Sequence, residues 1–425
     1  MFTQTRLQML PEPLRVLLLG SGGREHALAW KLCQSPLVEL IVVCPGNVAT
    51  EELTKTKNCK YESVEQALSV SKSRNINLAV FTNEADLAAG AVDLFSQEGI
   101  PCIGPPKKAS LLETSKVFAK RFMSKNNIPT ATYGHFSCYE ESLLFIEDQL
   151  AQGRRKVVLK HTGIGARQGV FVIETLEEAK QTLVAEFGGQ PCGTSRQPDF
   201  DILIEEFLED FKTRKENNQG PMTGGMGCVC PTIRCTESMF QALAQGFMAR
   251  TIAGLGKEGL DFPGFIAIDV ILTHDGPIAI EYDLRLGDPE TQASMPLIQP
   301  DLDLAKVLAQ CHSDQISLSS LLFQKDRFAA VVVAVTKKYP LESETQPLHV
   351  NLTTPTQKDT IIYHSHTFHP SVQPSQPVVQ ARGGRVLSVC GIGNNLDVAA
   401  QRAYSGMEAV KFEGMEYRTD IDNVL

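Results

Sequence analysis

The stretch VLLLGSGGREH, residues 16–26, decides the fold class of this chain. Its first four residues form a continuous apolar run, which is typical of a β-strand buried on both faces. Glycines end that run, and Ala27, Leu28, Trp30 and Leu32 then supply the apolar stripe of a helix. A buried strand, a tight turn and a helix in this order predict the first unit of a parallel α/β sheet.

Three further apolar runs repeat the pattern over the first hundred residues. They lie at residues 40–43, 78–81 and 101–103, and each ends in a turn that contains glycine, proline or asparagine. Such a series predicts right-handed βαβ units, whose ligands bind beyond the carboxyl ends of the strands. We expect an α/β protein in which residues 14–115 form a doubly wound parallel-sheet domain.

Two more blocks follow, residues 116–325 and residues 326–425, and both mix strands with helices. The strands expected in the second block are residues 157–160, 170–173, 202–204, 265–272 and 278–282, the last two as a hairpin. Residues 176–184 have the pattern of a helix. In the third block we expect strands at 329–335 and 385–389, a turn at 391–395 and a helix from Leu396.

Composition excludes several classes of protein. The 425 residues are 43% hydrophobic and 21% charged, as in ordinary globular proteins, and the longest apolar run is too short to span a membrane. A net charge of −9 disfavours a nucleic-acid-binding surface. The 11 cysteines are scattered without zinc spacing, and the residues before the first strand do not have the pattern of a secretory signal, so we expect none. We expect a cytoplasmic protein with reduced thiols and with neither nucleic acid nor membrane as a partner.

The glycine-rich turn Gly20-Ser21-Gly22-Gly23-Arg24-Glu25-His26 is a candidate anion site. Glycines let the backbone approach a ligand, and the helix N-terminus offers N–H groups to a phosphate, assisted by Arg24. Glu25 stands where the dinucleotide fingerprint needs its third glycine, which disfavours a nicotinamide-dependent oxidoreductase. The alternative is a tight strand–helix turn with no ligand.

Charged residues at strand ends are candidates for nucleotide binding. Lys160 follows three apolar residues at a strand end beside a glycine-bearing loop, where it could neutralise phosphate oxygens, and Lys116 is a second candidate for the same role. The run Glu205-Glu206-Phe207-Leu208 could pair its backbone with an adenine edge while an acid holds a sugar hydroxyl. The alternative for each is an ordinary solvated charge.

The predicted hairpin carries three carboxylates. Glu281 and Asp283 alternate along one strand and so share a face, and Asp269 on the facing strand could join them. Three oxygen donors suit a Mg²⁺ ion that also bridges nucleotide phosphates. The alternative is a metal-free ion-pair network with Arg285.

Two polar loops add to these candidates. Residues 284–292 form a turn packed with polar groups, and the glycine-dense residues 220–227 could close over an anion through their N–H groups. Together with the metal carboxylates and the two lysines, these loops indicate ATP-dependent activation of a carboxylate.

The motifs, taken in order, resemble those of the phosphoribosylamine–glycine ligases, purine-biosynthesis enzymes of the ATP-grasp superfamily. The matching segments are residues 20–26, 45–47, 104–105, 112–116 with Phe118 and Lys120, 128–130, 205–208, 223–227, 285–292, 383–387 and 417–421. The resemblance implies an ATP-grasp core with a lid at about 131–208, an N-terminal domain that binds substrate and a small α+β C-terminal domain. It also implies a reaction in which ATP converts glycine to glycyl phosphate, which 5-phosphoribosylamine then captures.

The resemblance assigns roles residue by residue. The catalytic residues it implies are Lys160, Arg285 and Asp288, and the ATP contacts are Lys116, Lys160, Glu205, Glu206, Phe207 and Leu208. The substrate contacts it implies are Gly20, Gly22, Gly23, Arg24, Glu25, His26, Asn47, Thr223, Gly224, Gly225, Asp288, Pro289, Glu290 and Thr291. It assigns Glu281 and Asp283 to Mg²⁺ or Mn²⁺, whereas Asp269, at a position that is usually uncharged in the family, is a candidate ligand from the hairpin alone. We expect a monomer or weak dimer.

The chain departs from the family pattern at several places. Arg167-Gln168-Gly169 replaces the Gly-Lys-Gly of the lid, Asp283 replaces an asparagine, and Thr82-Asn83-Glu84 replaces Gly-Pro-Glu. After Leu208 the family has room for a further β-hairpin that this chain lacks, so we expect an open nucleotide site and reduced activity. The alternatives are an ATP-grasp ligase for another acid and amine, and a non-catalytic protein that binds nucleotides or sugar phosphates.

Overall fold

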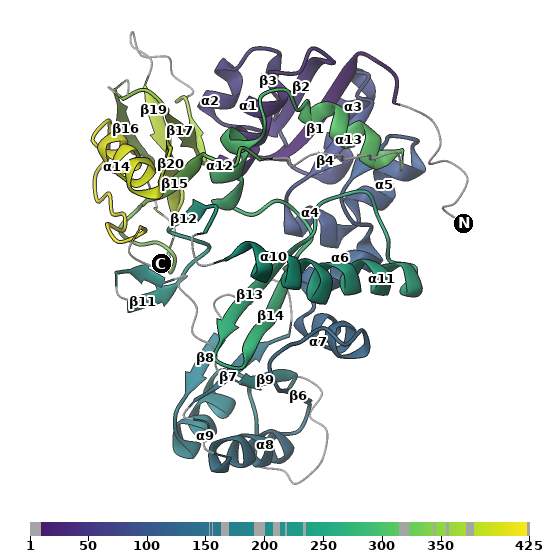
Figure 1. Ribbon diagram of the computed structural model, residues 1–425, viewed down its shortest axis with the longest axis vertical. Helices are drawn as coiled ribbons and strands as arrows, with labels where there is room; N and C mark the ends of the chain where they lie inside the picture. Colours follow the sequence, from purple (N-terminus) through teal and green to yellow (C-terminus); the bar gives the residue numbers. More distant parts are fainter. Residues whose placement is uncertain are drawn as a thin grey trace.

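A five-stranded parallel sheet forms the N-terminal part of the computed structural model (Figure 1). The structure describes residues 10–422 except 153, 155, 163–169, 191–199, 207–212, 217–218, 233–234, 314–322, 343, 345, 354–356 and 371–377, and only the backbone of Glu206. The strands are β1 (Leu14–Gly20), β2 (Val38–Pro45), β3 (Thr56–Asn58), β4 (Leu78–Phe81) and β5 (Cys102–Ile103), in the order β3-β2-β1-β4-β5. The predicted doubly wound sheet is confirmed, and its order reverses between β1 and β4.

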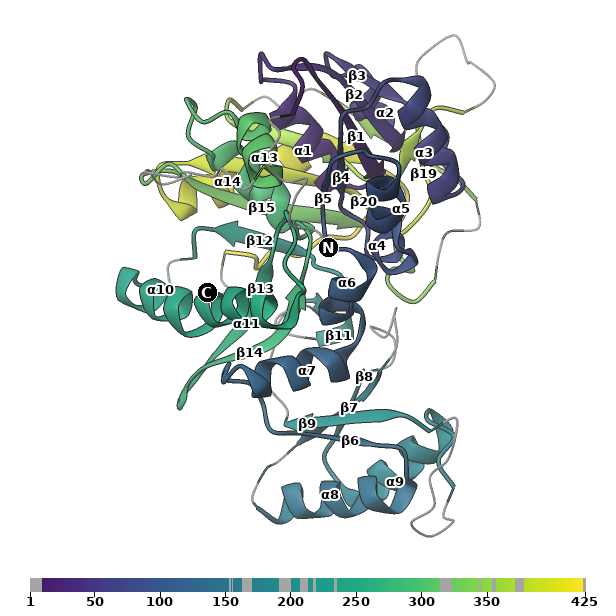
Figure 2. The same cartoon turned by 90° about the vertical axis from the view of Figure 1, so that its right-hand side faces the viewer.

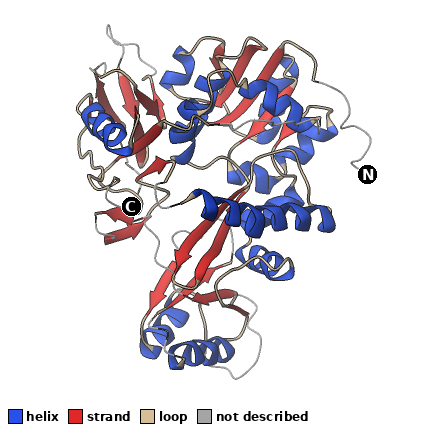
Figure 3. Ribbon diagram, viewed as in Figure 1, coloured by secondary structure: helices blue, strands red, loops and turns tan. Residues whose placement is uncertain are grey.

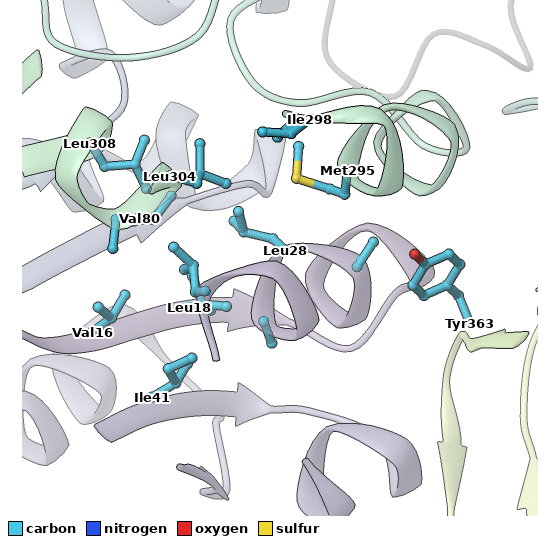
Figure 4. Close-up of a cluster of buried hydrophobic side chains, with 14 of the residues drawn as sticks. Val16, Leu18, Leu28, Ile41, Val80, Met295, Ile298, Leu304, Leu308 and Tyr363 are labelled. Atoms are coloured by element: carbon cyan, nitrogen blue, oxygen red, sulfur yellow. The ribbon is translucent and has the colours of Figure 1, made fainter. Parts of the chain in front are cut away.

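Helices cover both faces of this sheet (Figure 3). They are α1 (Gly23–Leu32), α2 (Val48–Glu52), α3 (Val64–Ser73), α4 (Glu84–Ala89) and α5 (Ala91–Gln97). Alternate residues of β1 belong to two hydrophobic cores, one on each face of the sheet. Val16 and Leu18 pack with Leu28 of α1 (Figure 4), whereas Leu17 and Leu19 pack with Phe95 of α5. Burial on both faces explains why the strand is a continuous apolar run.

A smaller antiparallel sheet lies at the opposite end of the molecule (Figures 1 and 2). Its strands are β6 (Tyr133–Phe136), β7 (Val157–His161), β8 (Val170–Ile173) and β9 (Ile202–Glu206), in the order β6-β9-β7-β8. Helices α8 (Tyr139–Ala151) and α9 (Leu176–Ala185) pack on one face through Ile146 and Leu183. The predicted strands at 157–160, 170–173 and 202–204 and the helix at 176–184 are present.

The predicted carboxylate hairpin connects the two ends of the molecule. Strands β13 (Ala267–Thr273) and β14 (Gly276–Asp283) pair in antiparallel fashion, with a bulge between Asp269 and Val270. Helices α6 (Lys107–Thr114) and α7 (Lys116–Lys125) pack against it. The helical segment beyond consists of α10 (Glu237–Leu243), a π-helical turn (Ala244–Met248) and α11 (Ala249–Glu258).

A second, short hairpin lies within residues 213–222, in the part of the segment after Leu208 that the structure describes. Strands β10 (Thr213–Lys215) and β11 (Gln219–Met222) pair with each other. They lie against the C-terminal segment, where Arg214 pairs with Glu416 at 2.7 Å and Arg418 donates to the backbone oxygen of Thr213 at 3.1 Å. These long-range contacts, which no local pattern reveals, hold the short hairpin in place.

The C-terminal part combines two four-stranded sheets, ordered β12-β15-β20-β17 and β18-β19-β16-β21. The strands are β12 (Gly227–Cys230), β15 (Phe328–Val335), β16 (Leu348–Leu352), β17 (Thr360–His364), β18 (Thr367–Phe368), β19 (Val379–Ala381), β20 (Arg385–Gly393) and β21 (Val410–Lys411). Helix α14 (Leu396–Met407) covers β20. Strand β20 continues through Gly391, where a turn was expected.

Three helical segments link the hairpin to the C-terminal sheet. They are α12 (Glu290–Ser294), a 3₁₀ turn (Met295–Leu297) and α13 (Leu304–His312), and α12 lies against both α1 and β12. Of the helices that the structure describes, none combines the length and the apolarity needed to cross a bilayer.

Candidate functional site

Four residues predicted to bind ATP or metal meet in one pocket, although they come from four separate elements. Lys116 opens α7, Lys160 lies in β7, Glu205 in β9 and Glu281 in β14, and all four line the same cavity. The side chain of Ser115 caps α7 by accepting from the N–H of Phe118, which fixes the start of the helix at Lys116. The fold therefore brings together residues that the sequence had marked separately.

Glu205 lies at the centre of this pocket and contacts two lysines. Its Oε2 is 2.9 Å from Nζ of Lys120, and its Oε1 contacts Nζ of Lys160. Burial lowers the pKa of Lys120 to about 8. The Glu205 carboxylate thus faces two cations. Phe207 and Leu208 lie outside the described residues, as does the Arg167–Gly169 segment.

The hairpin carboxylates take different positions. Asp269 and Glu281 are register partners, whereas Asp283 is paired with Arg285, whose Nη2 lies 3.2 Å from Oδ1. Nε of Arg285 is also 2.7 Å from Oε1 of Glu113, so the ion-pair network considered as an alternative is present. Burial raises the pKa of Glu113 to about 7, although Arg285 opposes the shift.

A metal ion fits this hairpin only with help from a ligand. Within the described parts of the chain, no three His, Cys, Asp or Glu side chains gather closely enough to hold an ion. Magnesium often binds through one or two carboxylates plus substrate phosphates, and Glu281 lines the same pocket as Lys116 and Lys160, which are suited to phosphates. The donor set therefore suits an ion that arrives with a nucleotide.

The glycine-rich turn before α1 holds its own carboxylate where a phosphate was expected. Glu25 Oε2 accepts from the N–H of Gly22 at 2.7 Å, and Oε1 accepts from Thr82 and from Nε of Arg24. At Gly20, where φ is +134°, an added Cβ would lie 2.5 Å from the Glu25 carboxyl carbon. The glycines therefore make room for this internal cap.

His26 and Asn47 join the N-terminal sheet to the C-terminal part. Nδ1 of His26 accepts from the backbone N–H of His364 at 3.0 Å, and Asn47 Nδ2 donates to the oxygens of Ser21 and His364. Burial lowers the pKa of His26 to about 3, so the ring is neutral and acts as an acceptor. Both residues thus hold the N-terminal turns against the end of β17.

Asp288 is the centre of a second polar cluster. Its Oδ1 accepts from Gln292 Nε2 at 2.7 Å, and its Oδ2 is 3.4 Å from Nη2 of Arg385. Burial alone would raise the pKa of Asp288, yet Arg385 and Arg24 outweigh it and keep that pKa below its usual value. Asp288 is therefore ionised and held in place.

The glycine-dense loop is fixed from the C-terminal part. Gly224 N donates to Tyr339 Oη at 3.0 Å, and Gly225 N donates to Thr223 Oγ1 at 3.1 Å. Arg385 Nη1 donates to the Gly224 oxygen. Two of the N–H groups expected to meet an anion thus donate within the chain.

A second cavity adjoins the first through Arg285. Its volume is about 300 Å³, and its polar lining includes Arg285, Glu290 and Thr291. Pro289 directly precedes α12, which presents Glu290 and Thr291 to this cavity. Glu113 lines the first cavity, which we call the lysine pocket, and pairs with Arg285, which lines the second. The Glu113–Arg285 ion pair therefore lies between the two cavities.

Sequence reasoning missed four residues of the site: Glu113, Lys120, Tyr339 and Arg385. Three of them stand in motifs that carried the resemblance without a role, which was the available signal. Tyr339 had no such signal. Its ring packs on Gly384, where an added Cβ would lie 1.9 Å from it, so this glycine makes room for the tyrosine.

Comparison with known families matches three models in succession. The phosphoribosylglycinamide synthetase N domain matches residues 14–113, the ATP-grasp (A) domain matches 114–212 and 206–291, and the C domain matches 329–423.

Relatives match nearly the whole chain. A phosphoribosylamine–glycine ligase of Clostridium acetobutylicum is 33% identical over 431 residues, covering 96% of this chain and 99% of its own. A bifunctional purine biosynthetic protein of Schizosaccharomyces pombe is 33% identical over 437 residues, and this chain spans 53% of its length.

Solved structures agree with the fold. The crystal structure of phosphoribosylamine–glycine ligase from Thermotoga maritima matches with a TM-score of 0.74 and 27% identity, covering 96% of this chain and 100% of that one. A biotin carboxylase from Campylobacter jejuni matches with a TM-score of 0.67 over 96% and 94% of the two chains, at 14% identity, and shows likeness of fold alone.

Proposed function

The chain belongs to the phosphoribosylglycinamide synthetase family, and on that premise we propose that it joins glycine to 5-phosphoribosylamine with cleavage of ATP. The products are glycinamide ribonucleotide, ADP and phosphate. The protein is thus a carbon–nitrogen ligase of purine biosynthesis.

One observation carries the proposal: lysines and an acid from separate elements converge on one pocket. Lys116, Lys160 and Glu281 line it together, offering two cations to phosphate oxygens and a carboxylate to a divalent ion. A nucleotide triphosphate requires this combination, because its negative charge must be offset before an anionic carboxylate can approach it.

The chemistry proceeds in two steps with balanced bonds. A carboxylate oxygen of glycine attacks the γ-phosphorus of ATP, the bond to the β-phosphate oxygen breaks, and ADP leaves. The amine nitrogen of phosphoribosylamine then attacks the carbonyl carbon of glycyl phosphate, phosphate leaves, and the nitrogen loses a proton. Lys116 and Lys160 stabilise the phosphate charges, and Arg285, between the two cavities, orients the carboxylate.

A divalent ion, Mg²⁺ or Mn²⁺, would be held by Glu281 with Asp269 or Asp283. When bound it neutralises charge on the phosphates during transfer. The neighbouring arginine has a different role, because the Arg285–Asp283 and Arg285–Glu113 pairs keep the carboxylates of this wall apart from one another.

We also propose the substrate contacts assigned from the sequence, with the Asp288 cluster and the loop at 223–225 facing phosphoribosylamine. The protein would act on small molecules in the cytoplasm, as a monomer or weak dimer without nucleic acid. The acidic net charge supports this, and so do the cysteines, because all those that the structure describes are free.

Phosphate release from ATP tests the proposal. Purified protein with Mg²⁺ is assayed with both glycine and phosphoribosylamine and then with each alone, and the product is identified by mass spectrometry. Release that requires both substrates, with glycinamide ribonucleotide formed, is the expected result. Release with another acid would indicate a ligase of different specificity, and nucleotide binding without release would indicate a non-catalytic protein.

A further inference from the structure

Lys120 differs from the other lysines of the nucleotide pocket because its ammonium group points into the protein. Its side chain is 3% exposed, whereas that of Lys160 is 14% exposed. Nζ of Lys120 lies 2.9 Å from Glu205 Oε2 and donates to Thr130 Oγ1 at 2.8 Å. Although Lys120 lines the pocket, its ammonium group is therefore already engaged by two protein oxygens.

Several elements fix the direction of this side chain. Lys120 lies one turn after Lys116 on α7, so both point to the same side of the helix. The hydroxyl of Thr130 donates in turn to the oxygen of Ala279 in β14 at 2.8 Å, and Ala279 N donates to Pro129 at 2.9 Å. The position of the ammonium group is therefore set by α7, by β9 and by the hairpin.

Glu205 divides its two oxygens between a buried and a more exposed lysine. Oε2 faces Lys120 and Oε1 faces Lys160. A buried carboxylate with a single cation would bind that cation strongly, because little water competes in a low-dielectric site. Lys120 neutralises part of the Glu205 charge, so Glu205 attracts Lys160 less strongly.

The charge balance of the pocket leads to the same conclusion. Three lysines and three glutamates line it, so the protein groups alone are close to neutral. Without Lys120 the lining would carry a net negative charge, which opposes a polyanionic ligand. Lys120, whose ammonium group is held by protein oxygens, thus contributes to the charge that the ligand meets.

We propose that Lys120 is a positioning residue for the phosphates of the bound nucleotide, acting through Glu205 to let the Lys160 ammonium exchange that carboxylate for phosphate oxygens. The inference rests on the proposed function, because it takes the pocket to be the ATP site. A purely structural Lys120 would instead stabilise the fold and affect every ligand of the pocket alike.

Binding of ATP and adenosine to the full chain separates these roles. Calorimetry with Mg·ATP and with adenosine is carried out on the natural protein, on Lys120→Met and on Lys125→Met, a control on the same helix whose side chain is 68% exposed. We expect Lys120→Met to weaken ATP binding about tenfold or more and adenosine binding less than about twofold, with Lys125→Met unchanged.

A second pair of variants shows the route of the effect. Adding Glu205→Gln to Lys120→Met removes the carboxylate that would otherwise hold Lys160, and we expect it to restore most of the lost ATP affinity. Thr130→Val keeps every charge but removes the hydroxyl partner of Lys120, and we expect about a threefold loss for ATP alone. It serves as the test if Lys120→Met does not fold.

The results contradict the inference if a folded Lys120→Met or Thr130→Val protein binds ATP as the natural protein does. Equal weakening of ATP and adenosine overturns it as well, since that marks a structural role. If the natural protein binds neither ligand, the proposed function fails together with the inference, and this outcome is visible before any variant is made.

Discussion

Nη1 of Arg385 lies 2.6 Å from the backbone oxygen of Asp288, and Nη2 of the same guanidinium lies 3.4 Å from the Asp288 carboxylate. The two residues are 97 positions apart in the chain. Since Arg385 also donates to the oxygen of Gly224, one C-terminal side chain holds both loops of the proposed phosphoribosylamine site. The C-terminal part is therefore a component of the site as well as of the scaffold.

Arg385→Met is expected to lower kcat/KM for phosphoribosylamine about 100-fold, because small misplacements of a substrate site are costly and Asp288 loses its cation. The affinity for Mg·ATP should not change, since Arg385 does not line the lysine pocket. Steady-state kinetics and calorimetry measure the two quantities. Arg382→Met is the control, because Arg382 is exposed and lies over the ring of Phe368. If Arg385→Met weakened ATP binding as much as it lowered kcat/KM for phosphoribosylamine, Arg385 would not act on the substrate loops alone.

Arg418→Met is expected to lower the free energy of unfolding by about 3 kcal/mol. The Arg418 side chain is buried and forms two hydrogen bonds with the Asp420 carboxylate, at 2.7 and 2.8 Å, besides its contact with Thr213. Its loss leaves Asp420 without this cation and releases the β10–β11 hairpin. Urea unfolding measures the change.

The matched control is Arg15→Met, which breaks the more exposed pair with Glu39 and should change stability by less than about 1 kcal/mol. If the two variants lose similar stability, the C-terminal segment does not anchor the hairpin as we describe.

Local patterns predicted the elements of the fold well. The run at residues 16–19 predicts its strand because burial on both faces selects apolar residues at every position. The carboxylate hairpin was predicted for a similar reason, since alternation and turn residues act over short distances. The same local information placed Lys160 and Glu281 at strand positions, and in the fold both residues line one pocket.

The partners of charged groups could not be predicted in this way. The resemblance made Glu25 a substrate contact without indicating its partners, and its carboxylate caps its own helix and accepts from Thr82 and Arg24. Arg385 and Asp288 meet because β20 and the loop before α12 are packed together, which nothing near either residue encodes. Which carboxylate faces which cation is decided by tertiary structure, whereas the presence of the charge is visible in the sequence.

Glu281→Gln is expected to reduce turnover at least about 100-fold while leaving the fold intact, because the amide is a poor ligand for a divalent ion. Rates measured across a series of Mg²⁺ and Mn²⁺ concentrations, together with an unfolding curve, check this. Asp269→Asn should raise the metal concentration needed for half the maximal rate if Asp269 shares the ion. If the rate of Glu281→Gln depended on metal concentration as that of the natural protein does, the assignment of Glu281 as a metal ligand would be wrong.

The buried histidines make stability depend on pH. Burial lowers the pKa of His26 to about 3 and that of His364 to about 4, against 6.5 for an exposed histidine. Below pH 6.5 the unfolded chain therefore binds more protons than the folded one, so stability falls as the pH is lowered toward those values. At pH 5 each histidine should cost about 2 kcal/mol relative to pH 7.

His26→Asn tests this, because the asparagine oxygen can still accept from the N–H of His364 while no longer taking up a proton. Urea unfolding at pH 5, 6 and 7 should show that the variant loses about 2 kcal/mol less than the natural protein between pH 7 and pH 5. His274→Asn is the control, since His274 is fully exposed at the tip of the hairpin and should leave the pH dependence unchanged. An unaltered pH dependence in His26→Asn would mean that His26 is accessible to protons in the folded state, and that the junction between α1 and β17 is looser than the 3.0 Å hydrogen bond indicates.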